Sequence, residues 1–212
     1  MFTNYLDDLD QRLPSLAPLR SSLAAAADLL AMAFDVGRKL LVCGNGGSAA
    51  DSEHIVGELM KGFVRRRPVA AESADMLMKI DPELGEVLCA GLQEALPAIA
   101  LTGHMSLHTA VSNDNGGDLP FAQQVWGYGN PGDVLWAIST SGNSRSVLLA
   151  AVAAKAKGMS VLAMTGCEGG HLAELADVCI RAPSGETYRA QEEHMAIYHT
   201  LCLAIEQRFF PE

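Results

Sequence analysis

The feature of this sequence that most constrains its fold is a series of short apolar segments, each followed by a turn. These segments occupy residues 39–43, 98–102, 133–138, 160–164 and 177–180. They are almost continuously apolar, which is typical of strands covered on both faces. Ala- and Leu-rich stretches with a helical pattern separate them, at residues 49–62, 119–129 and 144–157. This alternation predicts an α/β fold with an open parallel sheet, whose ligands bind beyond the carboxyl ends of the strands.

Three further segments lie outside this alternation. Residues 4–35 carry leucines at helical spacing and contain two prolines, which predicts an N-terminal helix or helix pair. Residues 188–209 predict a terminal helix. Residues 69–96 are amphipathic in the middle and predict an inserted helical segment, which is a lid, an interface or a plain surface helix. We therefore expect one domain over residues 1–212, with a helical segment at 1–35 and an insertion at 69–96.

Charge and cysteine usage limit the partners and the compartment. Fifteen Lys and Arg against twenty-five Asp and Glu give a net charge of −10, which disfavours nucleic acid and anionic membranes as partners. The five cysteines never occur as CxxC, which is typical of reduced thiols in the cytoplasm. The apolar stretch 23–34 contains Asp28 and is shorter than the ~20 residues that a membrane helix needs. No signal peptide is expected, because the N-terminus is acidic.

Two loops after predicted strands have the composition of phosphate sites. Residues Gly44–Ser48 form a glycine-rich turn before a helix, although a simple helix cap explains that turn equally well. Residues Ser139–Ser144 combine four hydroxyl groups, a glycine and a helix start, which favours phosphate binding over a plain cap. Asn113-Asp114 predicts a turn on the ligand side of the sheet. Residues 65–67 are three arginines, which we interpret as a solvated charge run.

The first candidate metal ligands lie on the helix after the glycine loop. His54 and Glu58 are four residues apart, so both side chains lie on one face of the predicted helix. An imidazole nitrogen and a carboxylate oxygen at this spacing can bind one zinc ion. The pair alone is a weak signal, because most such pairs are surface contacts.

The C-terminal helix offers further polar side chains at less certain spacing. Gln191 and His199 are about 12 Å apart along an ideal helix, so they would need to reach toward each other. His194 and Tyr198 are better spaced as a pair and could form only a structural hydrogen bond. Spacing therefore leaves the metal site open.

Four stretches together resemble a known family. The chain contains CGNGGSAADSEH, AISTSGNSRSVLLAA, KGMSVLAMTGCEGG and QEEHMAIYH. Over residues 35–210 these are similar to the SIS (sugar isomerase) family, and within it to the phosphoheptose isomerase branch. The resemblance implies a five-stranded parallel, flavodoxin-like sheet, a cytoplasmic homotetramer and active sites between subunits.

The resemblance also implies a ligand set and a reaction. Zinc would be held by His54, Glu58, Gln191 and His199. The reaction would convert sedoheptulose 7-phosphate to D-glycero-D-manno-heptose 7-phosphate, a lipopolysaccharide precursor, through an enediol, with Glu58 as base and His199 as partner acid or base. The substrate-binding residues implied are Asn45, Gly46, Gly47, Ser48, Asn113, Asp114, Ser139, Thr140, Ser141, Ser144 and Gln191.

Two alternatives remain open. One branch of the same family is a non-catalytic adaptor that binds a replication-initiator protein, and it has lost the Glu and final His positions that are present here as Glu58 and His199. The second alternative is an isomerase of another phosphosugar. It rests on three departures from the family pattern: the 69–96 insertion, Gly62 where an arginine is common, and Tyr188 where an aspartate is usual.

Overall fold

A five-stranded, fully parallel sheet forms the centre of the molecule, in the order β2-β1-β3-β4-β5. The computed structural model describes residues 3–211. The strands are β1 (Leu40–Cys43), β2 (Ala98–Ala100), β3 (Val134–Ile138), β4 (Ser160–Thr165) and β5 (Val178–Arg181). This is the flavodoxin-like strand order, so the predicted fold class is confirmed.

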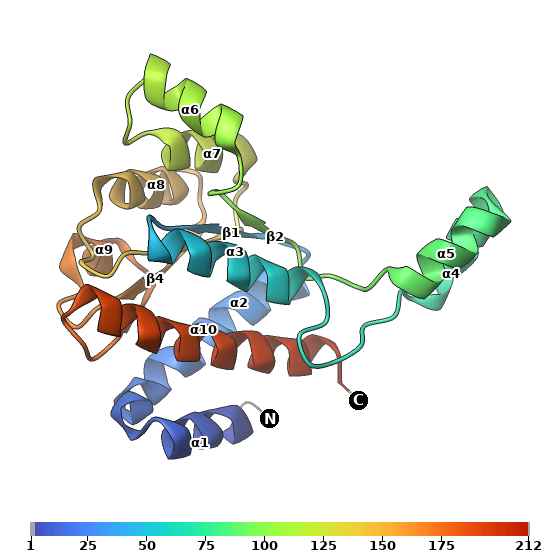
Figure 1. The fold of residues 1–212 in the computed structure, drawn as a ribbon, viewed down its shortest axis with the longest axis horizontal. Coiled ribbons are helices and arrows are strands. Elements are labelled where there is room, and N and C mark those ends of the chain that lie inside the picture. The colour runs from blue at the N-terminus through green and yellow to red at the C-terminus, as the bar shows by residue number, and fades with distance from the viewer. Residues whose placement is uncertain (1–2, 212) are drawn as a thin grey trace.

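Helices cover both faces of this sheet (Figure 1). The helices of the described chain, not all of which contact the sheet, are α1 (Thr3–Arg12), the 3₁₀ helix η1 (Pro14–Leu19), α2 (Arg20–Asp35), α3 (Gly47–Met60), α4 (Ala71–Ile80), α5 (Pro82–Gly91), α6 (Met105–Asp114), α7 (Pro120–Tyr128), α8 (Arg145–Ala156), α9 (Gly170–Leu175) and α10 (Thr187–Phe209). One core cluster lies between the sheet and α2, α3 and α10, and the other between the sheet and α7, α8 and α9.

The strands are apolar throughout because both of their faces are buried. In β3, Trp136 points into the cluster under α2 and α10, while its neighbours Leu135 and Ala137 point into the cluster under α7 and α8. All five residues of β3 are buried. A strand buried on one face would instead alternate apolar and polar residues.

The N-terminal segment forms two α-helices joined by η1. Pro14 and Pro18 lie in η1, where they interrupt regular α-helix. The segment Pro14–Asp35 has a mean hydropathy of 1.2 and is, among the described helices, the one long and apolar enough to cross a membrane by length and composition. Leu16, Leu23 and Leu30 of this segment are buried in the core. Packing under the sheet therefore accounts for part of its apolar character, since 39% of the apolar window is buried.

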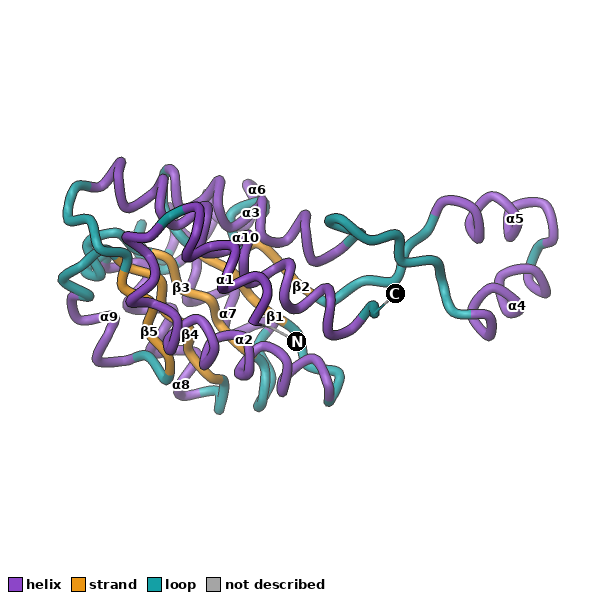
Figure 2. Tube along the Cα trace, turned by 90° about the horizontal axis from the view of Figure 1, so that it is seen from below, coloured by secondary structure: helices purple, strands orange, loops and turns teal. Residues whose placement is uncertain are grey.

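Residues 69–96 form a helical hairpin that projects away from the sheet (Figures 1 and 2). Asp81 ends α4 and caps α5, because its carboxylate accepts a hydrogen bond from Leu84 N at 3.0 Å. A bridge between Pro68 and Gln93 closes the base of the hairpin. The apolar residues of the predicted amphipathic face, such as Ile80, remain exposed. The function of this hairpin as a lid or an interface stays a prediction.

Candidate active site

The glycine-rich and hydroxyl-rich loops meet at the carboxyl ends of β1 and β3. They surround a cavity of about 320 Å³, together with the first residues of α10. The lining residues are Asn45, Gly46, Gly47, Ser48, Ile138, Ser139, Thr140, Ser141, Ser144, Thr187 and Gln191. The cavity thus gathers all of the implied substrate-binding residues except Asn113 and Asp114.

Side-chain contacts between the loops give the cavity its shape. Asn45 Nδ2 donates to Ser144 Oγ at 2.8 Å and to Ser146 Oγ at 2.9 Å, which ties the two loops together. The side chain of Gln191 lies directly over Gly47, where any Cβ would collide with it. Glycine at position 47 therefore lets α10 approach the start of α3. Gly47 and Ser48, the first residues of α3, line the cavity, and the N-terminal end of a helix favours an anion.

The prediction of a turn at Asn113-Asp114 is wrong. Both residues belong to the last turn of α6, and Asn113 Nδ2 donates to Asp114 Oδ1 at 2.8 Å. The segment Met105–Asp114 is helical although Asn and Asp are weak helix formers, because tertiary context overrides so small a difference in propensity. These two side chains are not among the described residues that line the cavity.

A second polar cluster lies further along the same two helices. His54 and Glu58 on α3 share a face as predicted, with His54 Nε2 3.1 Å from Glu58 Oε1. The imidazole of His199 on α10 packs against that of His54, with ring centroids 4.9 Å apart. The ring of Phe63 also lies near that of His199, with ring centroids 5.4 Å apart. The Glu58 side chain is 12% exposed and that of His54 is 41% exposed, so the carboxylate is largely shielded while the imidazole of His54 is open to solvent.

The donor chemistry of this cluster fits a zinc ion. His199 Nε2 is buried and has no hydrogen-bond partner among the described residues. Burial, followed by the nearby charge of His54, lowers the pKa of His199, which keeps the ring neutral with a free lone pair. Imidazole nitrogen and carboxylate oxygen are both ordinary zinc ligands.

The protomer does not present a finished four-ligand arrangement. Within residues 3–211, no three His, Cys, Asp or Glu side chains already surround a common point that could hold a metal ion. Gln191 lies at the first cavity, against Gly47, about two helical turns before His199. The structure therefore brings His54, Glu58 and His199 together and places Gln191 with the phosphate-type loops.

The pairing of His194 with Tyr198 is also wrong. His194 is fully buried, and its Nε2 lies 3.1 Å from the carbonyl oxygen of Thr165 on β4. Tyr198 instead reaches across to α3, where its hydroxyl lies 2.9 Å from His54 Nδ1. Residues four apart on one helix share a face, but each of these side chains has a nearer partner on the element against which α10 packs.

The three arginines at 65–67 are not a solvated charge run. Arg67 is 2% exposed and forms a salt bridge with Glu206 of α10, Nη2 to Oε1 at 2.8 Å. Arg67 also donates to the carbonyl oxygens of Leu59 and Glu58, at 2.8 Å and 3.2 Å. Glu206 accepts further hydrogen bonds from the backbone of residues 63 and 64. A buried ion pair between positions so distant in sequence leaves no local pattern that could predict it.

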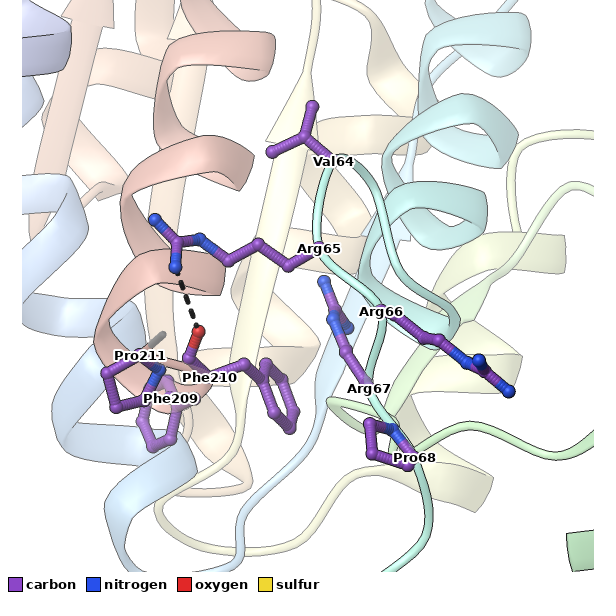
Figure 3. A pocket seen from close by; sticks show the side chains of 8 residues that line it. All are labelled: Val64, Arg65, Arg66, Arg67, Pro68, Phe209, Phe210 and Pro211. Atoms are coloured by element: carbon purple, nitrogen blue, oxygen red, sulfur yellow. Dashed lines mark hydrogen bonds between the residues drawn. The ribbon is translucent and has the colours of Figure 1, made fainter.

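These arginines also line a cavity of about 470 Å³, together with the end of α10 (Figure 3). The side chains diverge: Arg65 reaches the carbonyl oxygen of Phe210 at 3.5 Å, while Arg66 points away from it. The guanidinium of Arg67 stacks on the Phe210 ring, 4.4 Å from its centroid. The three charges do not converge on one point, so the cavity lacks the geometry of an anion site.

Comparison with known proteins places these features in a family. The model of the SIS domain family matches residues 4–85 and 73–166, and the chain belongs to that family. Phosphoheptose isomerases stand among its relatives. That of Rhodospirillum rubrum is 41% identical over 195 residues, covering 92% of this chain and 88% of the relative. That of Synechocystis sp. is 38% identical, covering 96% of this chain and 94% of the relative.

Solved structures agree with the sequence comparison. The phosphoheptose isomerase from Francisella tularensis superposes with a TM-score of 0.76 at 33% identity, over 97% of this chain and 96% of that one. The enzyme from Neisseria gonorrhoeae gives a TM-score of 0.74 at 33% identity, with the same coverage. The resemblance drawn from the loop motifs is thus confirmed.

Proposed function

We propose that this protein interconverts sedoheptulose 7-phosphate and D-glycero-D-manno-heptose 7-phosphate in the cytoplasm, as a step toward lipopolysaccharide heptose. The broader class, a phosphosugar isomerase, follows from the near full-length match to enzymes of one name. One observation supports the proposal most: the same two helices, α3 and α10, contribute both to the hydroxyl-lined cavity and to the cluster that contains Glu58 and His199.

The cavity of about 320 Å³ is suited to the phosphate end of the sugar. Hydroxyl groups and helix N-termini bind phosphate without a neighbouring cation. No lysine or arginine is among its described lining residues, which fits a chain with a net charge of −10. Binding energy at the remote phosphate would position the reacting carbons.

Isomerisation moves one proton between neighbouring carbons. A base removes a proton from C1 of the ketose while the C2 oxygen gains one; the enediol then loses the O1 proton as C2 is protonated. Glu58 is the proposed base, because it is a shielded carboxylate beside His54. His199 is the proposed partner, because its lowered pKa keeps it neutral and able to accept or donate a proton.

A zinc ion, when bound, would polarise the carbonyl and hydroxyl oxygens of the sugar. We propose His54, Glu58 and His199 as ligands, with Gln191 completing the set after its side chain leaves Gly47. We also propose that the chain acts as a homotetramer, since Asn113 and Asp114 do not reach the cavity of their own protomer and would meet substrate in a neighbouring one.

Proton NMR of sedoheptulose 7-phosphate with the zinc-loaded protein in D₂O tests this function. The expected product is an aldose carrying deuterium at C2. Glu58→Gln should lower turnover by at least about 100-fold, because a positioned general base contributes about that much. Glu53→Gln is the matched control: Glu53 lies on the same helix, and its carboxylate accepts from Thr102 Oγ1 at 3.0 Å, away from the cluster.

Three results would count against the proposal. Turnover by Glu58→Gln at the wild-type rate would remove Glu58 as the base. Turnover of another phosphosugar but not the heptose would keep the isomerase and change the substrate. Binding without turnover of any phosphosugar would favour the non-catalytic adaptor.

A further inference from the structure

The hydroxyl group of Tyr198 is the one polar atom of a fully buried side chain, and it is directed at a candidate metal ligand. It lies 2.9 Å from His54 Nδ1, and the two rings meet edge to face at 70° with centroids 5.4 Å apart. This contact crosses from α10 to α3. It therefore fixes the ring of His54 relative to the helix that carries His199.

Asp51 anchors the same hydroxyl from the other side. Asp51 precedes His54 by three residues on α3, so both side chains lie on one face. Asp51 is 8% exposed, and its buried Oδ2 has no hydrogen-bond partner among the described residues, which leaves it an acceptor for the Tyr198 hydroxyl with which it interacts electrostatically. Burial raises the pKa of Asp51 to about 6, while the interaction with Tyr198 lowers it.

The result is a chain of four groups: Asp51, Tyr198, His54 and Glu58. A tyrosine hydroxyl both donates and accepts, whereas a carboxylate only accepts. When Tyr198 donates to Asp51, its oxygen is free to accept from His54 Nδ1–H. That arrangement makes Nε2 the nitrogen available to a metal ion. Without the ion, the 3.1 Å contact between Nε2 and Glu58 Oε1 needs a proton on Nε2, because the carboxylate only accepts.

We propose that Tyr198 is a positioning residue that orients His54 for metal binding, with Asp51 as its anchor. This inference rests on the proposed function, since it concerns the ligand His54. Metal-bound histidines in general give their second nitrogen to a partner of this kind, and loss of that partner weakens metal binding by about 10- to 100-fold. A purely structural Tyr198 would instead matter through its ring alone.

Tyr198→Phe separates these roles, because phenylalanine keeps the buried ring and removes only the hydroxyl. Zinc affinity is measured by competition with a chromophoric chelator, for wild type, Tyr198→Phe and the control Tyr128→Phe. Tyr128 lies on α7 and is 37% exposed. We expect zinc binding weakened about 10- to 100-fold in Tyr198→Phe and unchanged in Tyr128→Phe. The KM for the phosphosugar should stay within about twofold of wild type, because the phosphate cavity is not lined by Tyr198.

A second readout needs no metal. Long-range ¹H–¹⁵N spectra of the metal-free protein report which imidazole nitrogen carries a proton. Tyr198→Phe should shift both His54 nitrogens and leave those of His108 on α6 unchanged. Asp51→Asn should shift them in the same direction, and it replaces Tyr198→Phe if that variant does not fold. Unchanged zinc affinity together with unchanged His54 nitrogens would overturn the inference. If the wild-type protein binds no zinc, the zinc site of the proposed function is wrong. The nitrogen spectra would still show whether Tyr198 orients His54.

Discussion

Replacing Arg67 by methionine should destabilise this protein more than any exposed substitution in the same loop. Methionine keeps much of the length of the side chain and removes its charge and donors. Glu206 would lose the guanidinium and keep the backbone N–H groups of Phe63 and Val64, at 2.7 Å and 3.0 Å. The carbonyl oxygens of Leu59 and Glu58 would also lose their donors, Arg67 Nη1 and Nη2.

The magnitude follows from burial. Both side chains of the Arg67–Glu206 pair are 0% exposed, so water cannot replace the lost partner. Breaking such a pair from one side costs about 3–5 kcal/mol in the free energy of unfolding. For a chain of 212 residues, that corresponds to a fall of roughly 6 to 20 °C in Tm. Screening by salt should change this little, because the pair is buried.

Chemical and thermal denaturation of the metal-free protein, followed by circular dichroism, measures the effect. Arg66→Met is the matched control: Arg66 is the exposed neighbour, and its loss should change stability by less than about 0.5 kcal/mol. Adding Glu206→Gln to Arg67→Met should recover part of the loss, because it removes the uncompensated buried charge. The reasoning is refuted if Arg67→Met costs less than about 1 kcal/mol or no more than Arg66→Met.

Three further outcomes are expected. Gly47→Ala should raise the KM for phosphosugar with little loss of fold, because its Cβ would displace Gln191 from the cavity; an unchanged KM in steady-state assays would contradict this. The free energy of unfolding should fall as pH decreases below about 6.5. Burial lowers the pKa of His194 in the folded protein, so at such pH the unfolded chain binds more protons than the folded one. Denaturation curves at pH 5 to 7.5 should show a weaker pH dependence for His194→Gln. Replacing residues 71–91 by a short Gly-Ser linker should leave Tm within a few degrees of wild type, because the hairpin packs mainly on itself; loss of the sheet signal in circular dichroism would show otherwise.

Much of the architecture was predictable because its causes are local in the sequence. Continuous apolar runs mark strands buried on both faces, and β1 and β3 fall inside the segments expected at 39–43 and 133–138. The two loops that line the cavity were also predictable, since glycine and hydroxyl residues stand directly after those strands. Helical spacing placed His54 and Glu58 on one face, and the structure has them 3.1 Å apart.

Only the tertiary structure decided which distant side chains meet. The Tyr198–His54 contact and the Arg67–Glu206 pair each join residues more than 130 positions apart, so no local pattern contains them. Arg67, expected from the sequence to be a surface charge, is one half of a buried ion pair. Local composition likewise misplaced Asn113 and Asp114 in a turn, because the helix that contains them is decided by its neighbours as well as its own residues. The sequence by itself determined the sheet, the loops and the family, since each depends on residues near one another in the chain. The packing of α3 against α10 determined the pairs that shape the site, because those pairs exist only when the two helices are side by side.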